Sequence, residues 1–402
     1  MNFDKLRTTR GLDLKAKRVL LRADLNVPVK DGKVTDATRL EKIVPGIHDL
    51  MHRGARVIII SHFGRPKGKA AAEFSLRPVA DKLAELLAHP VVFADDCVGE
   101  PAEQTVAALL PGAVAVLENL RFHKGEEAND PAFAKRLAAF GDIFVNDAFS
   151  AAHRAHASTD AITRLLPSYA GPLMIEEIDA LRSVLDNPKR PVAAVIGGAK
   201  VSTKIPILTN LAAKVDKLII GGGMANTFYL AQGVNIGTSL AEPEFVGTAN
   251  EIMHAAKARS CEVVLPPDVV IASKLEAGVP THVCPVLETP SDQMILDIGP
   301  KSVAHYVDVL SRCSTLLWNG PLGAFEVAPF GEGTFQVARA VAAATEAGKL
   351  TSVAGGGDTI AALNAAGVTD KFTYVSMAGG AFLEWLEGRD LPGIAALARG
   401  AA

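Results

Sequence analysis

The sequence predicts an α/β protein made of two doubly wound, parallel-sheet (Rossmann-like) domains that are joined by a helix. Short apolar segments alternate with helical patterns in both halves of the chain, and prolines isolate one helical segment between the halves. Hydrophobic residues make up 49% of the 402 residues, and aromatic residues only 5%. This length and composition suit two or three domains with large apolar cores and exclude a disordered chain.

The first half contains five apolar segments of strand length, with helical patterns at residues 39–53 and 76–88 between some of them. Strands that alternate with helices form a parallel sheet with helices on both faces. The predicted strands cover residues 18–25, 55–61, 91–94, 113–118 and 143–145. The second half repeats the pattern, with predicted strands at residues 192–196, 217–220, 262–265, 315–318, 350–354 and 372–376.

Four prolines bracket the segment between the halves, whose apolar residues recur at helical spacing. We therefore expect a first domain at residues 1–172, a connecting helix at 173–188 and a second domain at 189–377. The prolines are Pro167, Pro172, Pro188 and Pro191, and the apolar residues are Ile175, Ile178, Leu181, Val184 and Leu185.

Charge and cysteine content exclude several classes of protein. A net charge of −3 gives no overall attraction to nucleic acid or membranes, so any basic site must be local. The four cysteines form no CxxC pair, which argues against zinc and against a disulfide framework. The N-terminal residues lack the apolar core of a signal peptide, and the apolar runs are shorter than the about 20 residues that span a bilayer. We expect a cytoplasmic protein.

Glycine-rich junctions follow three predicted strands of the second half, at residues 197–198, 221–223 and 355–357. Glycine lets the backbone approach a ligand closely, and a helix behind it presents free N–H groups and the positive end of its dipole. Each junction alone is also an ordinary packing device. Three of them in one half, beside two lysines and an acid, favour a site for a nucleotide with several phosphates.

The charged residues beside these junctions suit phosphate and Mg²⁺. Lys200 and Lys204 are four residues apart, so we expect them to share one helix face and to point at the same phosphates. Asp358 opens a predicted helix, which it either caps or equips with an oxygen ligand for Mg²⁺. The chain lacks GxxxxGK[ST] and GxGxxG, which argues against P-loop NTPases and classical dinucleotide enzymes.

Polar and basic side chains follow the predicted strands of the first half. In an open parallel sheet, ligands bind beyond the carboxyl ends of the strands, so these side chains should converge at one edge. Arginine binds phosphate and carboxylate oxygens in two-point fashion, and the cluster predicts a small, highly charged anion as the ligand. Its basic residues are Arg39, His62, Arg65, Arg121 and Arg154, and Asp24 and Asn26 follow the first strand.

Less specific interpretations exist for some of these residues. Taken alone, Arg121 is explained as well by a surface salt bridge, worth about 0–1 kcal/mol, as by anion binding. His153 and His156 flank Arg154 at a spacing that differs from HExxH, and we expect them to be local hydrogen-bond partners rather than metal ligands.

Nine segments of the chain resemble the signature segments of the phosphoglycerate kinases, in the order of that family. They extend from Asp24 to Leu363 and read DLNVP, TDATRL, SHFGRP, ENLRF, NDAFSAAHRAHAS, GGAKVSTK, GGGMANTF, WNGPLGAFE and GGGDTIAAL. The resemblance implies a two-domain, hinge-bending enzyme of glycolysis that is a monomer. It would transfer a phosphoryl group reversibly from 1,3-bisphosphoglycerate to ADP, giving 3-phosphoglycerate and ATP.

The resemblance also implies roles for individual residues. Phosphoglycerate binding would fall on Asp24, Asn26, Arg39, His62, Arg65, Arg121 and Arg154. Binding of the Mg²⁺-nucleotide would fall on Lys200, Lys204, Gly222, Gly223, Asn319, Glu326, Gly356, Gly357, Asp358 and Thr359. Within this set, Glu326 resembles the acceptor for the ribose hydroxyls and Asp358 the Mg²⁺ ligand. The family's last residues return to the first domain, so residues 378–402 should pack there.

This reaction requires positively charged groups rather than a general base. The attacking carboxylate of 3-phosphoglycerate has a pKa near 4 and is already ionised at neutral pH. Fixed cations must instead meet the negative charge on the transferring phosphoryl group. Lys200 and Arg39, one from each domain, are the predicted catalytic residues. Closure of the domains would exclude water from the acyl phosphate.

Two alternatives belong to other classes. One is a dehydrogenase of the doubly wound type, and the absence of GxGxxG from the chain argues against it. The other is a nucleotide- or anion-sensing protein, which would bind its ligands without turnover. The chain departs from common family patterns at three places: the segment LMIEEIDAL lacks a lysine between its acids, Ser150 stands where glycine is frequent, and Phe63 where leucine is frequent.

Overall fold

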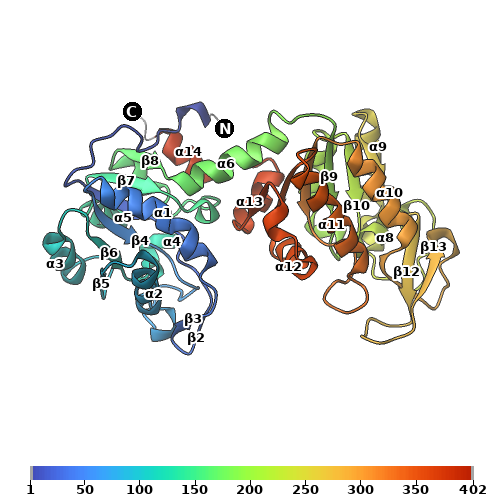
Figure 1. The fold of residues 1–402 in the computed structure, drawn as a ribbon, viewed down its shortest axis with the longest axis horizontal. Helices are drawn as coiled ribbons and strands as arrows, with labels where there is room; N and C mark the ends of the chain where they lie inside the picture. Colours follow the sequence, from blue (N-terminus) through green and yellow to red (C-terminus); the bar gives the residue numbers. More distant parts are fainter. Residues whose placement is uncertain (1–2, 400–402) are drawn as a thin grey trace. The chain divides into compact units, whose positions relative to one another are not determined.

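The computed structural model describes residues 3–399 and divides the chain into two compact α/β units (Figure 1). Unit 1 contains the residues up to Ile178 and those from Asp390 onward, and unit 2 contains Asp179–Arg389. Helix α6 (Pro172–Leu185) contributes residues to both units. It ends before Pro188, and its first turn is held by Asp147, whose carboxylate accepts the N–H of Met174 at 3.0 Å. Among the described residues, no helix is long and apolar enough to cross a membrane.

Unit 1 is built on a six-stranded parallel sheet with the strand order β5-β6-β4-β1-β7-β8. Alternate strand residues such as Val19, Val57 and Val114 enter one buried cluster with α1 and α2, because side chains alternate between the faces of a strand. The strands are β1 (Arg18–Arg22), β4 (Arg56–Ile60), β5 (Val91–Ala94), β6 (Val114–Leu117), β7 (Ile143–Asn146) and β8 (Ser168–Ala170). The main helices are α1 (Thr38–His52), α2 (Arg77–Leu87), α3 (Glu100–Ala108) and α5 (Pro131–Ala138).

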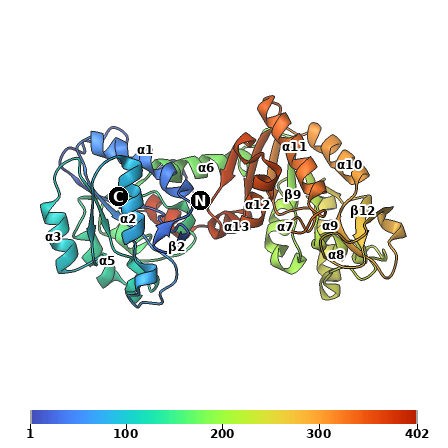
Figure 2. The ribbon, with the colours of Figure 1, turned by 60° about the horizontal axis from the view of Figure 1, so that its bottom comes forward.

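Unit 2 repeats this architecture with a six-stranded parallel sheet of order β11-β10-β9-β15-β16-β17. Helices α10, α11 and α12 bury one face of the sheet, and α8 and α9 lie side by side elsewhere in the unit (Figure 2). The strands are β9 (Val192–Ile196), β10 (Lys217–Ile220), β11 (Glu262–Val264), β15 (Thr315–Asn319), β16 (Thr351–Gly355) and β17 (Tyr374–Ser376). The helices are α7 (Ile205–Ala212), α8 (Gly223–Ala231), α9 (Val246–Ala258), α10 (Pro300–Ser311), α11 (Glu332–Glu346) and α12 (Gly357–Ala366).

The sequence pattern therefore predicted the fold class correctly but missed part of unit 2. A three-stranded antiparallel sheet with the order β13-β12-β14 was not predicted. Its strands are β12 (Asp268–Ala272), β13 (His282–Pro285) and β14 (Met294–Ile298). The residues of β13 are mostly exposed, so the apolar signal that identifies buried strands is weak there.

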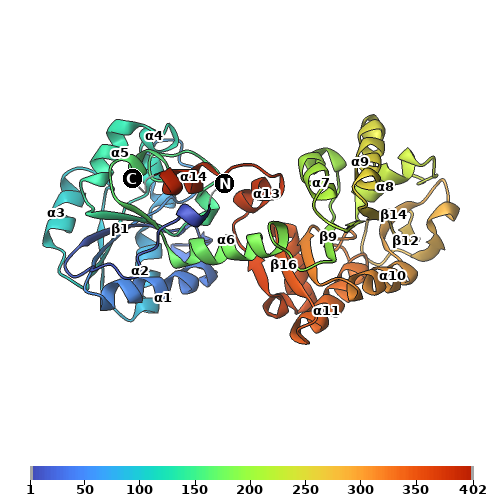
Figure 3. The same cartoon turned by 90° about the horizontal axis from the view of Figure 1, so that it is seen from above.

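The C-terminal segment returns to unit 1 later than expected (Figure 3). Helix α13 (Gly380–Leu386) packs on α7 in unit 2, where Asn210 donates a hydrogen bond to the carbonyl of Leu386 at 2.7 Å. Helix α14 (Pro392–Arg399) contacts unit 1, where the N–H of Gly393 donates to the carbonyl of Ala152 at 2.8 Å. The expectation that the return begins at residue 378 was therefore wrong, because the apolar face of α13 belongs to unit 2. Residues 400–402 of the expected tail lie outside the described part of the chain.

Candidate functional site

The carboxyl ends of the neighbouring strands β6, β4, β1 and β7 bring the predicted anion-binding residues of unit 1 together. Asp24 forms an ion pair with Arg39, and the hydroxyl of Ser150 donates to the same carboxylate at 2.5 Å. Burial alone would raise the pKa of Asp24, but Arg39, His62 and the Ser150 hydrogen bond hold it below its ordinary value. The negative charge of Asp24 is therefore retained and orients the Arg39 guanidinium.

The loop after β4 is tied to its neighbours by the same residues. Asn26 accepts the N–H of Gly64 at 3.0 Å, and Arg121 donates to the carbonyl of Gly64 at 2.8 Å. The Arg121 side chain is only 12% exposed and pairs with Glu127 at 3.4 Å, so a simple surface salt bridge does not describe it. Burial lowers the pKa of Arg121, and the nearby charges of Arg154 and Arg65 lower it further. These three arginines thus form one concentrated positive region that suits an anion.

Sequence reasoning missed the buried arginine beneath this region. Arg22 is 1% exposed, and its guanidinium donates to Ser158 Oγ at 3.0 Å, to the carbonyl of Ala23 at 2.5 Å and to His62 Nδ1 at 3.0 Å. Ser158 in turn donates its hydroxyl to the fully buried Glu126 at 2.6 Å. The sequence contained a sign of this arginine, because Arg22 ends the apolar segment RVLLR. A charged side chain is buried in such a strand only where hydrogen-bond partners surround it.

The histidines around Arg154 have different environments. His153 Nε2 accepts a hydrogen bond from Arg154 Nε at 3.3 Å, and His156 Nδ1 lies 3.8 Å from the carboxylate of Glu126. Burial lowers the pKa of His156 to about 4, and the nearby arginines Arg121 and Arg22 act in the same direction. The prediction that both histidines are local hydrogen-bond partners agrees with these contacts for His153, while His156 faces a buried carboxylate.

In unit 2, the residues that follow β9, β15 and β16 meet at the carboxyl edge of the sheet. The ammonium group of Lys204 contacts Oδ1 of Asn319, whose amide donates to the carbonyl of Gly355 at 2.7 Å. The hydroxyl of Thr359 accepts the N–H of Gly320 at 2.7 Å. Burial lowers the pKa of Lys204, while the charge of Asp358 opposes this shift. The charged groups of Lys204 and Asp358 are therefore close enough to interact.

Two local expectations about this edge were wrong. Lys200 and Lys204 do not share a helix face, because they flank the 3₁₀ turn η6 (Val201–Thr203) and α7 begins only at Ile205, with Pro206 in its first turn. Asp358 does not cap α12. The N-cap of this helix is Gly356, so no side-chain hydrogen bond caps the helix. Asp358 lies in the first turn of α12 and is exposed.

The glycines of the junctions serve both packing and access. A Cβ atom on Gly222 would lie 2.7 Å from the carbonyl oxygen of Gly198, and one on Gly223 would lie 2.7 Å from that of Ala199. A Cβ atom on Gly356, whose φ is +99°, would lie 2.5 Å from the amide nitrogen of Asn319. These close contacts agree with the interpretation of the glycines as packing devices, and their part in ligand binding stays a prediction.

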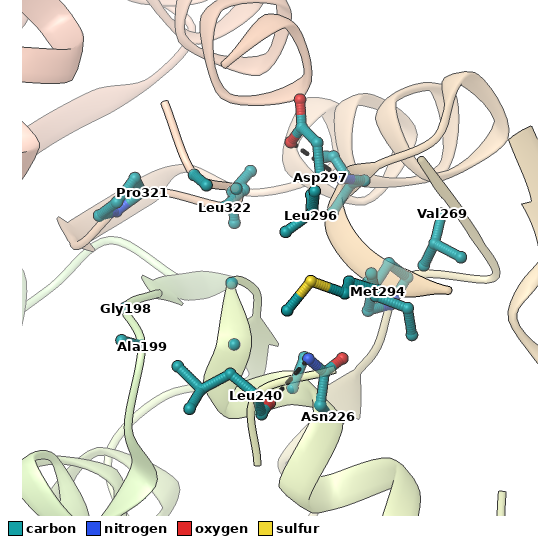
Figure 4. A pocket seen from close by; sticks show the side chains of 18 of the residues that line it. Gly198, Ala199, Asn226, Leu240, Val269, Met294, Leu296, Asp297, Pro321 and Leu322 are labelled. Atoms are coloured by element: carbon teal, nitrogen blue, oxygen red, sulfur yellow. Dashed lines mark hydrogen bonds between the residues drawn. The ribbon is translucent and has the colours of Figure 1, made fainter. Parts of the chain in front are cut away.

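A cavity of about 290 Å³ adjoins this edge (Figure 4). Its walls are mainly apolar, and the side chain of Met294 extends into the space between Leu240 and Leu322. Four predicted nucleotide-binding residues, Gly222, Gly223, Glu326 and Asp358, also line it. An apolar slot with acids at its margin suits a planar base with a polar sugar attached. Sequence reasoning missed Met294, the first residue of β14, and Leu240, which lies in a loop, because a single apolar residue carries no signal of a ligand.

The family profile described as phosphoglycerate kinase matches residues 9–389 of the chain. The chain belongs to the phosphoglycerate kinase family. The phosphoglycerate kinase of Methylorubrum extorquens strain PA1 is 58% identical over 384 residues, 96% of each chain. That of Bradyrhizobium diazoefficiens is 57% identical over 394 residues, 98% of this chain and 99% of the relative.

Solved structures of phosphoglycerate kinases have the same fold. The structure of the enzyme from Coxiella burnetii matches with a TM-score of 0.91 and 43% identity, over 99% of this chain and 100% of the other. That from Pyrococcus horikoshii OT3 matches with a TM-score of 0.82 and 30% identity, over 98% and 99%. The resemblance drawn from the nine segments is confirmed. The chain is accordingly a glycolytic kinase, a phosphotransferase whose acceptor is a carboxyl group, and the dehydrogenase and sensor alternatives are wrong.

Proposed function

We propose that unit 1 binds 3-phosphoglycerate or 1,3-bisphosphoglycerate and that unit 2 binds MgADP or MgATP, for the reversible reaction 1,3-bisphosphoglycerate + ADP ⇌ 3-phosphoglycerate + ATP. One observation carries the division: each parallel sheet presents charged side chains beyond its strand ends, arginines in unit 1 and lysines with glycines in unit 2. Ligands of open parallel sheets bind at these ends.

The proposed anion site of unit 1 consists of Asp24, Asn26, Arg39, His62, Arg65, Arg121 and Arg154. The arginines bind the phosphate and carboxylate oxygens, because planar guanidinium groups make two-point contacts with them. Asp24 holds Arg39 by its ion pair. The positive region formed by Arg65, Arg121 and Arg154 offsets the negative charge of the substrate.

The proposed nucleotide site of unit 2 consists of Lys200, Lys204, Gly222, Gly223, Asn319, Glu326, Gly356, Gly357, Asp358 and Thr359. The apolar cavity takes the base, and Glu326 on its wall accepts hydrogen bonds from the ribose hydroxyls. Lys204 binds phosphate oxygens, with Asn319 fixing its ammonium group. The carboxylate of Asp358, which makes no capping hydrogen bond, fits Mg²⁺. This ion favours oxygen ligands and would neutralise phosphate charge when it is bound.

Catalysis in this scheme rests on position and charge. The carboxylate of 3-phosphoglycerate is ionised at neutral pH, so no residue has to remove a proton from it. Arg39 and Lys200 meet the charge that spreads over the transferring phosphoryl group. Because the two ligands bind to different units, we propose hinge bending to bring them into line and to exclude water.

We further propose a cytoplasmic monomer whose partners are these small molecules, without nucleic acid or membrane. Membership of a glycolytic family and a net charge of −3 support this proposal. Light scattering at the concentration used for kinetics tests the monomer, and a mass of about two chains would contradict it.

A coupled assay that follows ADP formation from 3-phosphoglycerate and MgATP tests the activity directly. Calorimetry of the whole chain with each ligand alone tests the division of sites. We expect turnover only with both substrates, and separate binding of each. Absence of turnover, or binding of 3-phosphoglycerate that is lost on mutation of unit 2 alone, would contradict the proposal.

A further inference from the structure

The turn that carries both lysines of unit 2 is held from outside by one distant carboxylate. The oxygens of Glu242 accept the N–H of Ser202 at 2.9 Å and the hydroxyl of Ser202 at 2.6 Å. Ser202 is the central residue of η6, with Lys200 directly before the turn and Lys204 directly after it. Glu242 lies 40 residues further along the chain and is only 8% exposed.

The turn needs such a partner because it is too short to satisfy its own backbone. The first N–H groups of any helix lack acceptors within it, and a three-residue turn consists almost entirely of such groups. Inside the turn, Lys204 N–H donates to the carbonyl of Val201 at 2.8 Å, and Thr203 donates its hydroxyl to the carbonyl of Lys200 at 2.9 Å. Glu242 supplies the acceptor for the N–H of Ser202, the residue at the centre of the turn.

Glu242 also joins this turn to the neighbouring glycine junction. Its own N–H donates to the hydroxyl of Thr227 at 3.0 Å, and Thr227 is buried on α8. Helix α8 begins at Gly223, which packs against Ala199 just before Lys200. One side chain with its backbone therefore connects the turn after β9 to the helix after β10.

The charge of Glu242 acts on the site as well. Burial alone would raise the pKa of Glu242, but the hydrogen bonds from Ser202 and the charge of Lys200 lower it. The carboxylate is thus ionised and stands near enough to Lys200 to attract its exposed ammonium group. The side chain of lysine is flexible. It loses less conformational entropy in the transition state of phosphoryl transfer when its backbone and its charge are already held in place.

We propose that Glu242 is a positioning residue that fixes the Lys200–Lys204 turn for phosphoryl transfer, acting through Lys200 rather than on the ligands. This inference rests on the proposed catalytic role of Lys200. It goes beyond that role because it assigns a function to a residue that lies outside both proposed ligand sites.

The first test compares three variants of the whole chain by steady-state kinetics with 3-phosphoglycerate and MgATP. Glu242→Ala removes the acceptors, and we expect kcat to fall by about tenfold to a hundredfold, the range for a displaced catalytic group. KM for 3-phosphoglycerate should stay unchanged, because that ligand binds to unit 1. Glu242→Gln keeps an acceptor for the Ser202 N–H and should restore most of kcat. Glu244→Ala is the matched control, because this exposed glutamate lies two residues away in the 3₁₀ turn η7 (Pro243–Phe245), whose N-cap is Glu242.

The decisive measurement is Glu242→Ala in a Lys200→Met background, because residues that act as one unit lose activity only once. We expect no further fall in kcat there, whereas a merely structural role would lower kcat in both backgrounds by the same factor. A Glu242→Ala variant with normal kcat, or an equal loss in both backgrounds, would overturn the inference. If Lys200→Met itself keeps normal kcat, the proposed role of Lys200 is wrong and this inference falls with it. If only Lys200→Met loses activity, the inference alone fails.

Discussion

The guanidinium of Arg22 donates a hydrogen bond to Nδ1 of His62 across 3.0 Å in the interior of unit 1. A guanidinium has donors but no acceptor, so Nδ1 carries the lone pair and the proton of the neutral ring lies on Nε2. Burial lowers the pKa of His62 well below its ordinary value, and the charge of Arg22 lowers it further. His62 is therefore a neutral donor at physiological pH.

This relationship predicts that His62 does not titrate between pH 8 and pH 6. Nitrogen NMR of the imidazole should show a protonated Nε2 and an unprotonated Nδ1 throughout this range, and His62→Gln identifies the resonances by their loss. Gln also presents an N–H, so this variant should keep more affinity for 3-phosphoglycerate than His62→Phe. A titration of the His62 ring anywhere in this range would contradict the assignment.

The arginine region of unit 1 predicts a selective loss of affinity. Arg154→Ala should weaken binding of 3-phosphoglycerate by about 1.5–3 kcal/mol, the scale of a hydrogen bond to a charged group, and should leave ADP affinity nearly unchanged. Isothermal calorimetry with each ligand measures both effects. Arg164→Ala is the control, since this arginine is 58% exposed and pairs with Asp160. Equal losses for both ligands would contradict the division between the units.

Asp358 predicts a dependence on the metal rather than on the nucleotide alone. Asp358→Asn removes the charge that Mg²⁺ prefers, so MgADP affinity and turnover should fall while metal-free ADP binds nearly as before. Because Asp358 makes no capping hydrogen bond, the helix should be little affected. Titrations of ADP with and without Mg²⁺ test this, with Asp370→Asn, an exposed site in the same unit, as the control. A parallel loss of both forms of ADP would show that Asp358 has another role.

The two lysines of unit 2 should differ in kinetic effect. Lys200 stands exposed at the first glycine junction, so Lys200→Met should lower kcat by about 10²–10³ with little change in either KM. Lys204 is already held by Asn319, and Lys204→Met should mainly raise KM for the nucleotide, because it binds phosphate in the ground and transition states alike. Steady-state kinetics decide the matter. The opposite pattern would show that the two roles are reversed.

Asp297 predicts how the stability of unit 2 depends on pH. Burial raises the pKa of this carboxyl from 3.8 to about 7, although it accepts the N–H groups of Gly333 at 2.9 Å and Ile298 at 2.8 Å. Between these two pKa values the folded state holds a proton that the unfolded state has lost. The free energy of unfolding should therefore fall as pH rises through this interval, by up to about 1.4 kcal/mol per pH unit from this group.

Urea unfolding at several pH values, followed by the fluorescence of Trp318 and Trp385 in unit 2, measures this slope. Asp297→Asn should flatten the slope, because asparagine has no proton to lose. Asp308→Asn is the control, since Asp308 is 54% exposed on α10. An unchanged slope in Asp297→Asn would mean that other groups cause the pH dependence.

The sequence by itself determined the fold class, the family and the groups that form the charged edges. The apolar residues 57–60 of β4 and all residues of β9 (Val192–Ile196) are buried, and a continuous apolar run predicts a strand that is covered on both faces. The order of residues after each strand then placed Arg39, His62 and Arg121 at one edge, since parallel strands end on the same side of a sheet.

Only the tertiary structure decided which partners hold these residues. Arg22 and Ser158 are separated by 136 residues, and Ser202 and Glu242 by 40, so no local pattern joins them. The boundary between α13 and α14 was decided in the same way, because both helices are apolar and only contact shows that the first packs on α7. Hydrophobic periodicity tells which face of an element is buried, whereas hydrogen-bond partners and the neighbour that covers the face depend on how distant segments meet.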